Sequence, residues 1–388
     1  MTQCDDERII FHVDLDAFYV EVERQNDVSL KGKPVIIGGL GPRGVVSTAS
    51  YEARKFGIYS SQSMTLARRL CPQAIFMRGS HDLYRLISQK FTDILREFSP
   101  QVVPVSIDEA YMDMTGTDRL YGQPLEAAMA IRKKVRDDLG LPASIGIGPS
   151  NLVAKVSTEH AKPDGVFQVR QCEAAAFFAP QPVRNLPGIG PKASEILAKL
   201  RITTLGELAA APIGPLRRAL GPNQVDDIQC RAKGIDQTVL QERTKTKTIS
   251  AETTFDSDIA GRHVLERTLK QLCERVGRRL RGSGQLAKGT NIKLRYGDFT
   301  TITRQLRFPT PSDTDELIYK SAVMLLISAL GQRGDPIRLI GVGVNGLGEK
   351  AAQLSLLDEN SVADSEITEV LDTIRDRFGT KSISYGSS

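Results

Sequence analysis

The stretch FHVDLDAFYVEVE, residues 11–23, begins with apolar residues that run into an acid, Asp14. Residues 9–15 predict a strand, and residues 17–25 predict a helix. Asp14 therefore falls where the strand should end. Taken alone, an acid at a strand end is most often a solvated turn residue, so its meaning depends on its neighbours.

Three more side chains of interest follow Asp14 closely in the sequence. Asp16 directly precedes the expected helix, which is a position typical of an N-cap. Phe18 and Tyr19 follow within about one helical turn. An adjacent aromatic pair ordinarily packs in a core. Structural and functional interpretations of this stretch are both open at this point.

Length and composition restrict the class of protein. A chain of 388 residues exceeds one ordinary core, so two to four domains are expected. The formal charge of +5 is a weak indication of a polyanionic partner. Five scattered cysteines without a C-x-x-C pair indicate neither a disulfide framework nor a zinc site. With no apolar signal segment or membrane-length stretch, we expect a cytoplasmic protein without a membrane partner.

The first part of the chain predicts a β-α-β-β-α-β order. After the first strand we expect short strands at 34–39 and 44–50, then helices and strands at 81–97, 102–116 (a hairpin), 124–140 and 142–148. This order is typical of a split βαβ sheet with helices on one face.

The second part of the chain has a different pattern of predicted secondary structure. Residues 183–240 predict only helices, 241–250 form a polar linker, and 251–347 return to an α+β pattern. Residues 241–347 hold 18 Lys and Arg against 11 Asp and Glu, a net of +7, whereas 348–388 hold 4 against 8. A segregated basic domain followed by an acidic tail is a stronger nucleic-acid signal than a uniform charge.

A second acidic site lies in SIDEA, residues 106–110. Asp108 and Glu109 are adjacent, and adjacent strand residues point to opposite faces. Both can reach one site only if the hairpin bends there, as the flanking runs VVPV and AYMDM suggest. With Asp14 they would supply oxygen ligands suited to Mg²⁺. Two such ions suit phosphoryl transfer. Solvated turn residues are the alternative.

Six motifs occur in order: HVDLDAFYVEVE, STASYEARKFGI, SIDEAYMDMTG, AKPDG, NLPGIGPK and IRLIGVGV. Together they resemble a Y-family (translesion) DNA polymerase of the DNA polymerase IV or DinB type, over about residues 8–347. The resemblance implies an α+β multidomain, right-hand fold with a split βαβ palm. The expected domains are palm (1–27 and 81–172), fingers (28–80), helical thumb (173–240), linker (241–250), little finger (251–347) and acidic tail (348–388).

The resemblance also implies a metal site. The ligands fall on Asp14, Asp108 and Glu109, with the backbone carbonyl of Leu15. Glu109 is the residue that the family treats as catalytic. The implied cofactor is a pair of Mg²⁺ ions, with Mn²⁺ as a substitute.

A nucleotide site follows from YEARKFG and AKPDG. Tyr51 and Arg54 lie three residues apart on one helical face, and a phenol hydroxyl with a cationic fork suits phosphate oxygens. By resemblance, Lys162 completes this clamp and Thr48 lies near the same phosphates. Asn151 departs from the family, in which a lysine is frequent at this place.

Phe18 and Tyr19 acquire a role from the same resemblance. The family places the second ring under the incoming sugar, where it collides with a 2′-hydroxyl. Tyr19 is therefore the expected steric gate, and rejection by a clash can exceed what one lost contact gives.

The thumb motif NLPGIGPKASEIL resembles a helix-hairpin-helix. Gly188 and Gly190, with Lys192 beside them, would let the backbone approach a DNA phosphate without reading sequence. An ordinary Gly-Pro turn is the alternative.

The acidic tail contains QLSLLD, residues 353–358, which resembles the peptide that docks on the bacterial sliding clamp. The anchors are Gln353, Leu354, Leu356 and Leu357. The alternative is a small helix that packs on the little finger.

The expected function is template-directed addition of dNMP from dNTP to a primer 3′-hydroxyl on primer-template DNA, by a monomer. No second acidic cluster resembles an exonuclease site, so no proofreading is expected. A clamp-recruited DNA-binding scaffold and a nucleotidyl cyclase are the alternatives. The full set of acids disfavours the scaffold, and the basic C-terminal domain disfavours the cyclase.

Overall fold

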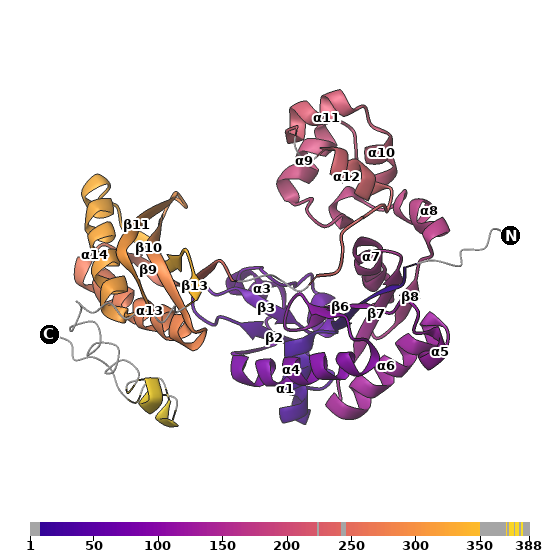
Figure 1. Ribbon diagram of the computed structural model, residues 1–388, viewed down its shortest axis with the longest axis horizontal. Helices are drawn as coiled ribbons and strands as arrows, with labels where there is room; N and C mark the ends of the chain where they lie inside the picture. Colours follow the sequence, from indigo (N-terminus) through magenta and orange to yellow (C-terminus); the bar gives the residue numbers. More distant parts are fainter. Residues whose placement is uncertain are drawn as a thin grey trace. The chain divides into compact units, whose positions relative to one another are not determined.

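The computed structural model describes residues 8–222, 225–241, 246–349, 370, 372–375, 377–379 and 382. The chain divides into two compact units (Figure 1). The first comprises Met1–Leu40 with Gly44–Arg243, and the second comprises Gly41–Arg43 with Thr244–Ser388. The expected clamp-binding residues 353–358 lie outside the described residues. Within the described part of the chain, no helix is long and apolar enough to cross a membrane.

Five strands form the main sheet of the first unit, in the spatial order β5-β6-β1-β7-β8. Their bounds are Ile10–Leu15 (β1), Val102–Pro104 (β5), Glu109–Asp113 (β6), Ala143–Gly148 (β7) and Val166–Gln168 (β8). β1 lies in the middle and pairs antiparallel with β6 and β7. The predicted first strand and hairpin are confirmed, and the strand that ends in acids is the central one.

Helices cover both faces of this sheet. They are α1 (Phe18–Asn26), α4 (His81–Phe98), α5 (Asp118–Tyr121), α6 (Pro124–Leu139) and α7 (Asn151–Ala161). α4 and α6 share a core with Phe11, Val13 and Leu15, the residues of β1 that point to one face. α7 packs on β1 and β7 from the other side (Figure 1). The expectation of helices on one face is therefore wrong. Glycine explains the difference, because a Cβ at Gly146 of β7 would collide with the backbone of α7.

A smaller sheet, in the order β3-β2-β4, follows α1 in the chain. Its elements are a 3₁₀ turn (Val28–Leu30), β2 (Val35–Gly38), β3 (Val46–Ala49), α2 (Tyr51–Arg54), α3 (Met64–Leu70) and β4 (Ile75–Met77). β2 and β3 match the predicted strands. β4 pairs parallel with β2 and was not expected, since three residues are too few to show a pattern.

The rest of the first unit is helical. Its elements are α8 (Ala174–Phe178), α9 (Pro191–Lys199), α10 (Leu205–Ala210), α11 (Ile213–Leu220) and α12 (Val225–Ala232), with 3₁₀ turns at Gln171–Glu173 and Val183–Asn185. Leu152, Val153 and Val156 of α7 belong to the core of this region. α7 therefore has one side on the sheet and another on the helical region.

The second unit holds a four-stranded antiparallel sheet in the order β11-β10-β12-β9, and β13 pairs with β10. Its elements are β9 (Thr248–Ile259), α13 (Arg262–Gly282), β10 (Gln285–Tyr296), β11 (Thr301–Ser312), α14 (Asp315–Gln332), β12 (Ile337–Asn345) and β13 (Gly348–Glu349). Residues 248–250, expected in the linker, belong to β9. Ile292 and Leu294 of β10 join the core with α13 and α14. Lys293 and Arg295 alternate with them and point to the opposite face.

Part of the acidic tail also packs on this unit. Residues 372–375 are helical. The carboxylate of Asp372 lies 2.7 Å from Nε of Arg281, and Arg375 lies 3.1 Å from Glu274. Arg281 and Glu274 are both in α13, so two ion pairs attach the end of the tail to this helix.

Candidate active site

The strand register brings two of the acids together. Asp14 of β1 lies directly opposite Glu109, the first residue of β6. Opposed residues on neighbouring strands have their side chains on the same face. His12 shares this face, because it precedes Asp14 by two residues and contacts Thr158 of α7. The alternation of β1 thus separates a core face from a polar face.

The third acid reaches the site through a bend. The backbone amides of Val105 and Ser106 donate to the carbonyl of Glu109, at 3.0 and 3.3 Å. The amide of Leu15 donates to the carbonyl of Asp108 at 2.9 Å. Asp108 therefore lies just before β6 and escapes the alternation of the strand. The predicted bend between Asp108 and Glu109 is confirmed.

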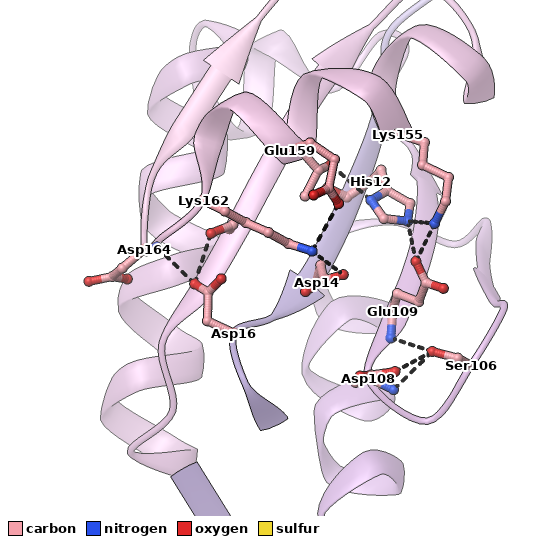
Figure 2. A network of polar contacts seen from close by, with 12 residues as sticks. His12, Asp14, Asp16, Ser106, Asp108, Glu109, Lys155, Glu159, Lys162 and Asp164 are labelled. Atoms are coloured by element: carbon pink, nitrogen blue, oxygen red, sulfur yellow. Dashed lines mark hydrogen bonds and ion pairs between the residues drawn. The ribbon is translucent and has the colours of Figure 1, made fainter. Parts of the chain in front are cut away.

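Asp14 is paired with a lysine (Figure 2). Its Oδ2 lies 3.0 Å from Nζ of Lys162, which lies 3.0 Å from Glu159 as well. The pKa of Asp14 is raised to about 7, mainly by burial and also by the charges of Asp108 and Glu109, while Lys162 opposes the rise. Burial disfavours the ammonium of Lys162, but Asp14 and Glu159 outweigh burial and hold its pKa above its usual value.

Glu109 has two side-chain partners, a histidine and a lysine. Its Oε2 lies 2.9 Å from Nε2 of His12 and also pairs with Nζ of Lys155 (Figure 2). These contacts, that of His12 first, lower the pKa of Glu109 to about 2. Burial lowers the pKa of His12, and Nδ1 of its ring lies 2.8 Å from Oγ1 of Thr158. Glu109 is thus ionised and held by neighbours from β1 and α7.

The acids fit a divalent cation by chemistry. In the part of the chain that the structure describes, no three acid, His or Cys side chains lie close enough to hold an ion as they stand. Asp14 is turned to Lys162, Glu109 to Lys155, and Asp108 to Ser106. The donors are nevertheless carboxylate oxygens at adjoining strand ends, which suit Mg²⁺. Burial raises the pKa of Asp14, and a bound cation would stabilise its ionised form.

A cavity of about 190 Å³ lies at the end of β1. Its walls include nine of the predicted site residues: Asp14, Leu15, Phe18, Tyr19, Thr48, Tyr51, Arg54, Asp108 and Lys162. Asp16, Ala17, Ser47 and Ser60 complete the lining. The main sheet and the smaller sheet therefore share one polar cavity. Glu109 does not border it, because its carboxylate is turned to His12 and Lys155.

Tyr51 and Arg54 come from the short helix α2. Ser50 caps this helix, and its hydroxyl accepts from the amide of Ala53 at 3.2 Å. The guanidinium of Arg54 lies 4.6 Å from the centre of the Tyr51 ring, and its Nε donates to the carbonyl of Ala49 at 3.1 Å. These contacts leave the two terminal amino groups of Arg54 for an anionic ligand.

Asp16 is not the N-cap that its position predicted. Ala17 occupies the N-cap with a φ of 45°, and no side chain caps the helix. This left-handed turn directs Asp16 into the protein, where it is 2% exposed. It accepts from the Tyr51 hydroxyl at 2.9 Å, the Ser144 hydroxyl at 2.8 Å and the amide of Asp164 at 2.8 Å. Burial, followed by Asp16, raises the pKa of Tyr51.

The two rings of the opening stretch have different surroundings, although their centroids lie 5.6 Å apart. Tyr19 stacks on Tyr84, with centroids 4.2 Å apart and planes at 12°, and meets the edge of His81. The hydroxyl of Tyr84 donates to Glu23 at 2.5 Å, which fixes the supporting ring. Phe18 is 1% exposed and its ring lies in the core, which is the alternative interpretation of this residue.

The helical region has the expected turn. Gly188 has a φ of 95°, which favours glycine. Gly190 is the N-cap of α9, with Pro191 and the exposed Lys192 in the first turn. A Cβ at Gly190 would meet no protein atom within 4 Å. Packing within the chain therefore does not account for glycine at this position.

Several residues of the site were not predicted: His12, Lys155, Tyr84, Ser144 and Asp164. A period-two reading of β1 from Asp14 would have placed His12 on the acidic face. The other four come from distant segments and carry no local signal. Asn151, the departure from the family, is the first residue of α7, and its Oδ1 is buried without a hydrogen-bond partner among the described residues.

Comparison with known proteins agrees with this geometry. A model described as the impB/mucB/samB family matches residues 13–159, and one for its C-terminal domain matches residues 246–356. The chain is 42% identical to a DNA polymerase IV of Dehalococcoides mccartyi, over 98% of this chain and 97% of that protein. It is 40% identical to a DNA polymerase IV of Halorhodospira halophila, over 90% and 98%.

A solved structure shows the same fold. It is a Y-family DNA polymerase chimera, 22% identical, with a TM-score of 0.80 over 88% of this chain and 99% of that one. The expected α+β right-hand polymerase fold is therefore confirmed. The chain belongs to the DNA polymerase IV family.

Proposed function

We propose that this chain adds dNMP from dNTP to a primer 3′-hydroxyl, directed by a template strand and without proofreading. One observation supports this most: one cavity is bordered both by acids and by groups that suit phosphate oxygens. Asp14 and Asp108 come from the main sheet, Tyr51 and Arg54 from α2, and Lys162 from the end of α7. Acids and cations around one cavity suit a metal-bound triphosphate.

Asp14, Asp108 and Glu109, with the carbonyl of Leu15, would hold two Mg²⁺ ions, for which Mn²⁺ would substitute. When bound, these ions lower the pKa of the primer hydroxyl and neutralise charge on the leaving pyrophosphate. In their absence Lys162 supplies part of the positive charge to Asp14. If a bound cation neutralised Asp14 instead, Lys162 would be available to a phosphate oxygen.

The remaining walls select and orient the nucleotide. Arg54 presents a cationic fork to the triphosphate, with Thr48 nearby, and Tyr51 borders the same space. Tyr19 lies under the position of the sugar and rejects a 2′-hydroxyl. Stacking on the buried Tyr84 holds the Tyr19 ring in place. The ring therefore cannot move aside for a 2′-hydroxyl, and the steric clash rejects the ribonucleotide.

The domains follow from these roles. We assign the main sheet to the palm, the smaller sheet to the fingers, α8–α12 to the thumb and the second unit to the little finger. Gly188, Gly190 and Lys192 would hold a DNA phosphate at the start of α9. The exposed face of β10, with Lys293 and Arg295, would add a salt-dependent contact with DNA. The segment 353–358 would dock on a sliding clamp in the cytoplasm.

Primer extension with Mg²⁺ and dNTPs tests the proposal. Asp108→Ala should abolish extension, whereas Asp113→Ala, at the far end of the same hairpin strand, should retain it. A clamp-recruited scaffold would show no extension in the parent, and a nucleotidyl cyclase would release a cyclic product without template. Full extension by Asp108→Ala would contradict the site assignment.

A further inference from the structure

Asp16 joins three segments that are distant in sequence. Its Oδ1 accepts a hydrogen bond from Tyr51 of α2, and its Oδ2 accepts from Ser144 of β7 and from the backbone amide of Asp164 beyond α7. These partners lie 35, 128 and 148 residues away. A buried carboxylate is tolerated when donors satisfy it, and Asp16 has three. It belongs to neither the acids of the metal site nor the cap of α1.

Two of these partners control groups in the cavity. Tyr51 borders the cavity itself, beside Arg54. Asp164 lies two residues after Lys162, whose ammonium faces Asp14 (Figure 2). A shift of either segment would therefore move a phosphate-binding group relative to the acids.

The segment after Lys162 is held on both sides. From outside the cavity, Nη2 of Arg132 donates to Oδ1 of Asp164 at 2.7 Å, and Arg136 pairs with its other oxygen. From inside, Asp16 accepts the amide of Asp164. The residue has a φ of 51°, which a non-glycine residue adopts only when its surroundings hold it there.

The hydrogen bond from Tyr51 has a chemical consequence. A hydroxyl has one proton, and the Tyr51 proton is directed to Oδ1 of Asp16. While this bond lasts, the hydroxyl can only accept from other groups. The charge that meets a triphosphate then comes from Arg54 and Lys162, and Tyr51 serves mainly to support the guanidinium that lies over its ring.

We propose that Asp16 is a positioning residue for the incoming triphosphate, because it holds Tyr51 and the segment 162–164 in one fixed relation. The inference rests on the proposed nucleotide cavity. Asp16 touches no reacting atom; it acts through the residues that border the cavity.

Substitution of Asp16 should affect its three hydrogen-bond donors differently. Asp16→Asn keeps one carbonyl oxygen and introduces an NH₂ group. The amide of Asp164 cannot reverse its role, whereas the Tyr51 hydroxyl can turn and accept. The asparagine should therefore direct its oxygen to Asp164 and its NH₂ to Tyr51. Asp16→Asn should alter the Tyr51 contact alone, and Asp16→Ala should release both sides.

The test measures the dissociation constant of dNTP in a ternary complex with a dideoxy-terminated primer, on the full chain with Mg²⁺. Loss of hydrogen bonds to a charged group predicts a rise of about tenfold or more for Asp16→Ala and a smaller rise for Asp16→Asn. In a Tyr51→Phe background, Asp16→Asn should have almost no further effect, but Asp16→Ala should still weaken binding. The affinity for primer-template DNA should stay the same.

Asp113→Asn and Asp113→Ala are the matched controls, since Asp113 also accepts a backbone amide, that of Thr115, in the same sheet. They should leave dNTP binding unchanged, with melting temperatures recorded for all variants. Unchanged dNTP affinity in Asp16→Ala, or an equal loss of primer-template affinity, overturns the role of Asp16. If Tyr51→Phe and Lys162→Ala also bind dNTP like the parent, the proposed cavity is wrong as well.

Discussion

Asp14 offers the sharpest test of the electrostatics of the site. We expect Asp14→Asn to raise the thermal stability of the metal-free protein at pH 8, although it removes an acid of the proposed metal site. The cause is burial: the pKa of Asp14 is about 7 in the folded chain, against 3.8 ordinarily. A neutral amide of the same shape avoids the burial of a charge.

The sign and size follow from proton linkage. A carboxyl with a raised pKa in the folded chain loses stabilisation as the pH rises from about 3.8 to about 7. At about 1.4 kcal/mol per pH unit, the full interval corresponds to about 4 kcal/mol. Asparagine at position 14 also loses the attraction to the charge of Lys162. Lys162 itself keeps Glu159 as a partner at 3.0 Å. We therefore expect about half of that value, or about 2 kcal/mol, to appear as a gain.

Thermal melting in EDTA at pH 5 and pH 8 measures this difference. At about 2–4 °C per kcal/mol for a folding unit of this size, the gain at pH 8 should be about 4–8 °C and much smaller at pH 5. Added Mg²⁺ should stabilise the parent more than the variant. Asp113→Asn, in the same sheet but outside the cavity, is the control for the loss of one carboxylate.

Two results would refute this reasoning. One is a melting temperature for Asp14→Asn at pH 8 that equals or falls below that of the parent. The other is a gain of the same size at both pH values, which would mean that packing and not ionisation is responsible.

Three further predictions concern separate parts of the chain. Tyr19→Ala should raise ribonucleotide incorporation by about tenfold or more in primer extension, and unchanged rejection of rNTPs would exclude the gate. Gly188→Ala should weaken primer-template binding severalfold with kcat unchanged, because a φ of 95° disfavours a side chain at a cost of about 1 kcal/mol; wild-type affinity by fluorescence anisotropy would argue against the turn as a DNA contact. Deletion of 353–358 should leave basal extension intact but abolish stimulation by a bacterial sliding clamp, and continued stimulation would place the clamp site elsewhere.

Local patterns predicted much of the site. They are the end of a strand at Asp14, the bend at Asp108 and Glu109, and the helical face of Tyr51 and Arg54. Each of these features is local in the sequence and depends on alternation, turns or helical spacing, which a sequence displays directly. The order of the motifs then indicated the family, which the comparisons show.

Two predictions failed because they depended on distant contacts. Asp16 has the position of a cap, but a left-handed turn at Ala17 sends it to Tyr51, Ser144 and Asp164. The sheet was expected to carry helices on one face, but glycine at Gly146 lets α7 lie on the other. In both cases the partner that decides the outcome is remote in the chain.

The sequence by itself thus determined the chemistry of this protein: which acids, rings and cations are present, and in what local order. Only the tertiary structure decided their partners. It paired Asp14 with Lys162 and Glu109 with Lys155, and it made Asp16 a support between the two sheets instead of a helix cap. The physical reason is that burial and charge compensation depend on which segments meet, and no local pattern contains that information.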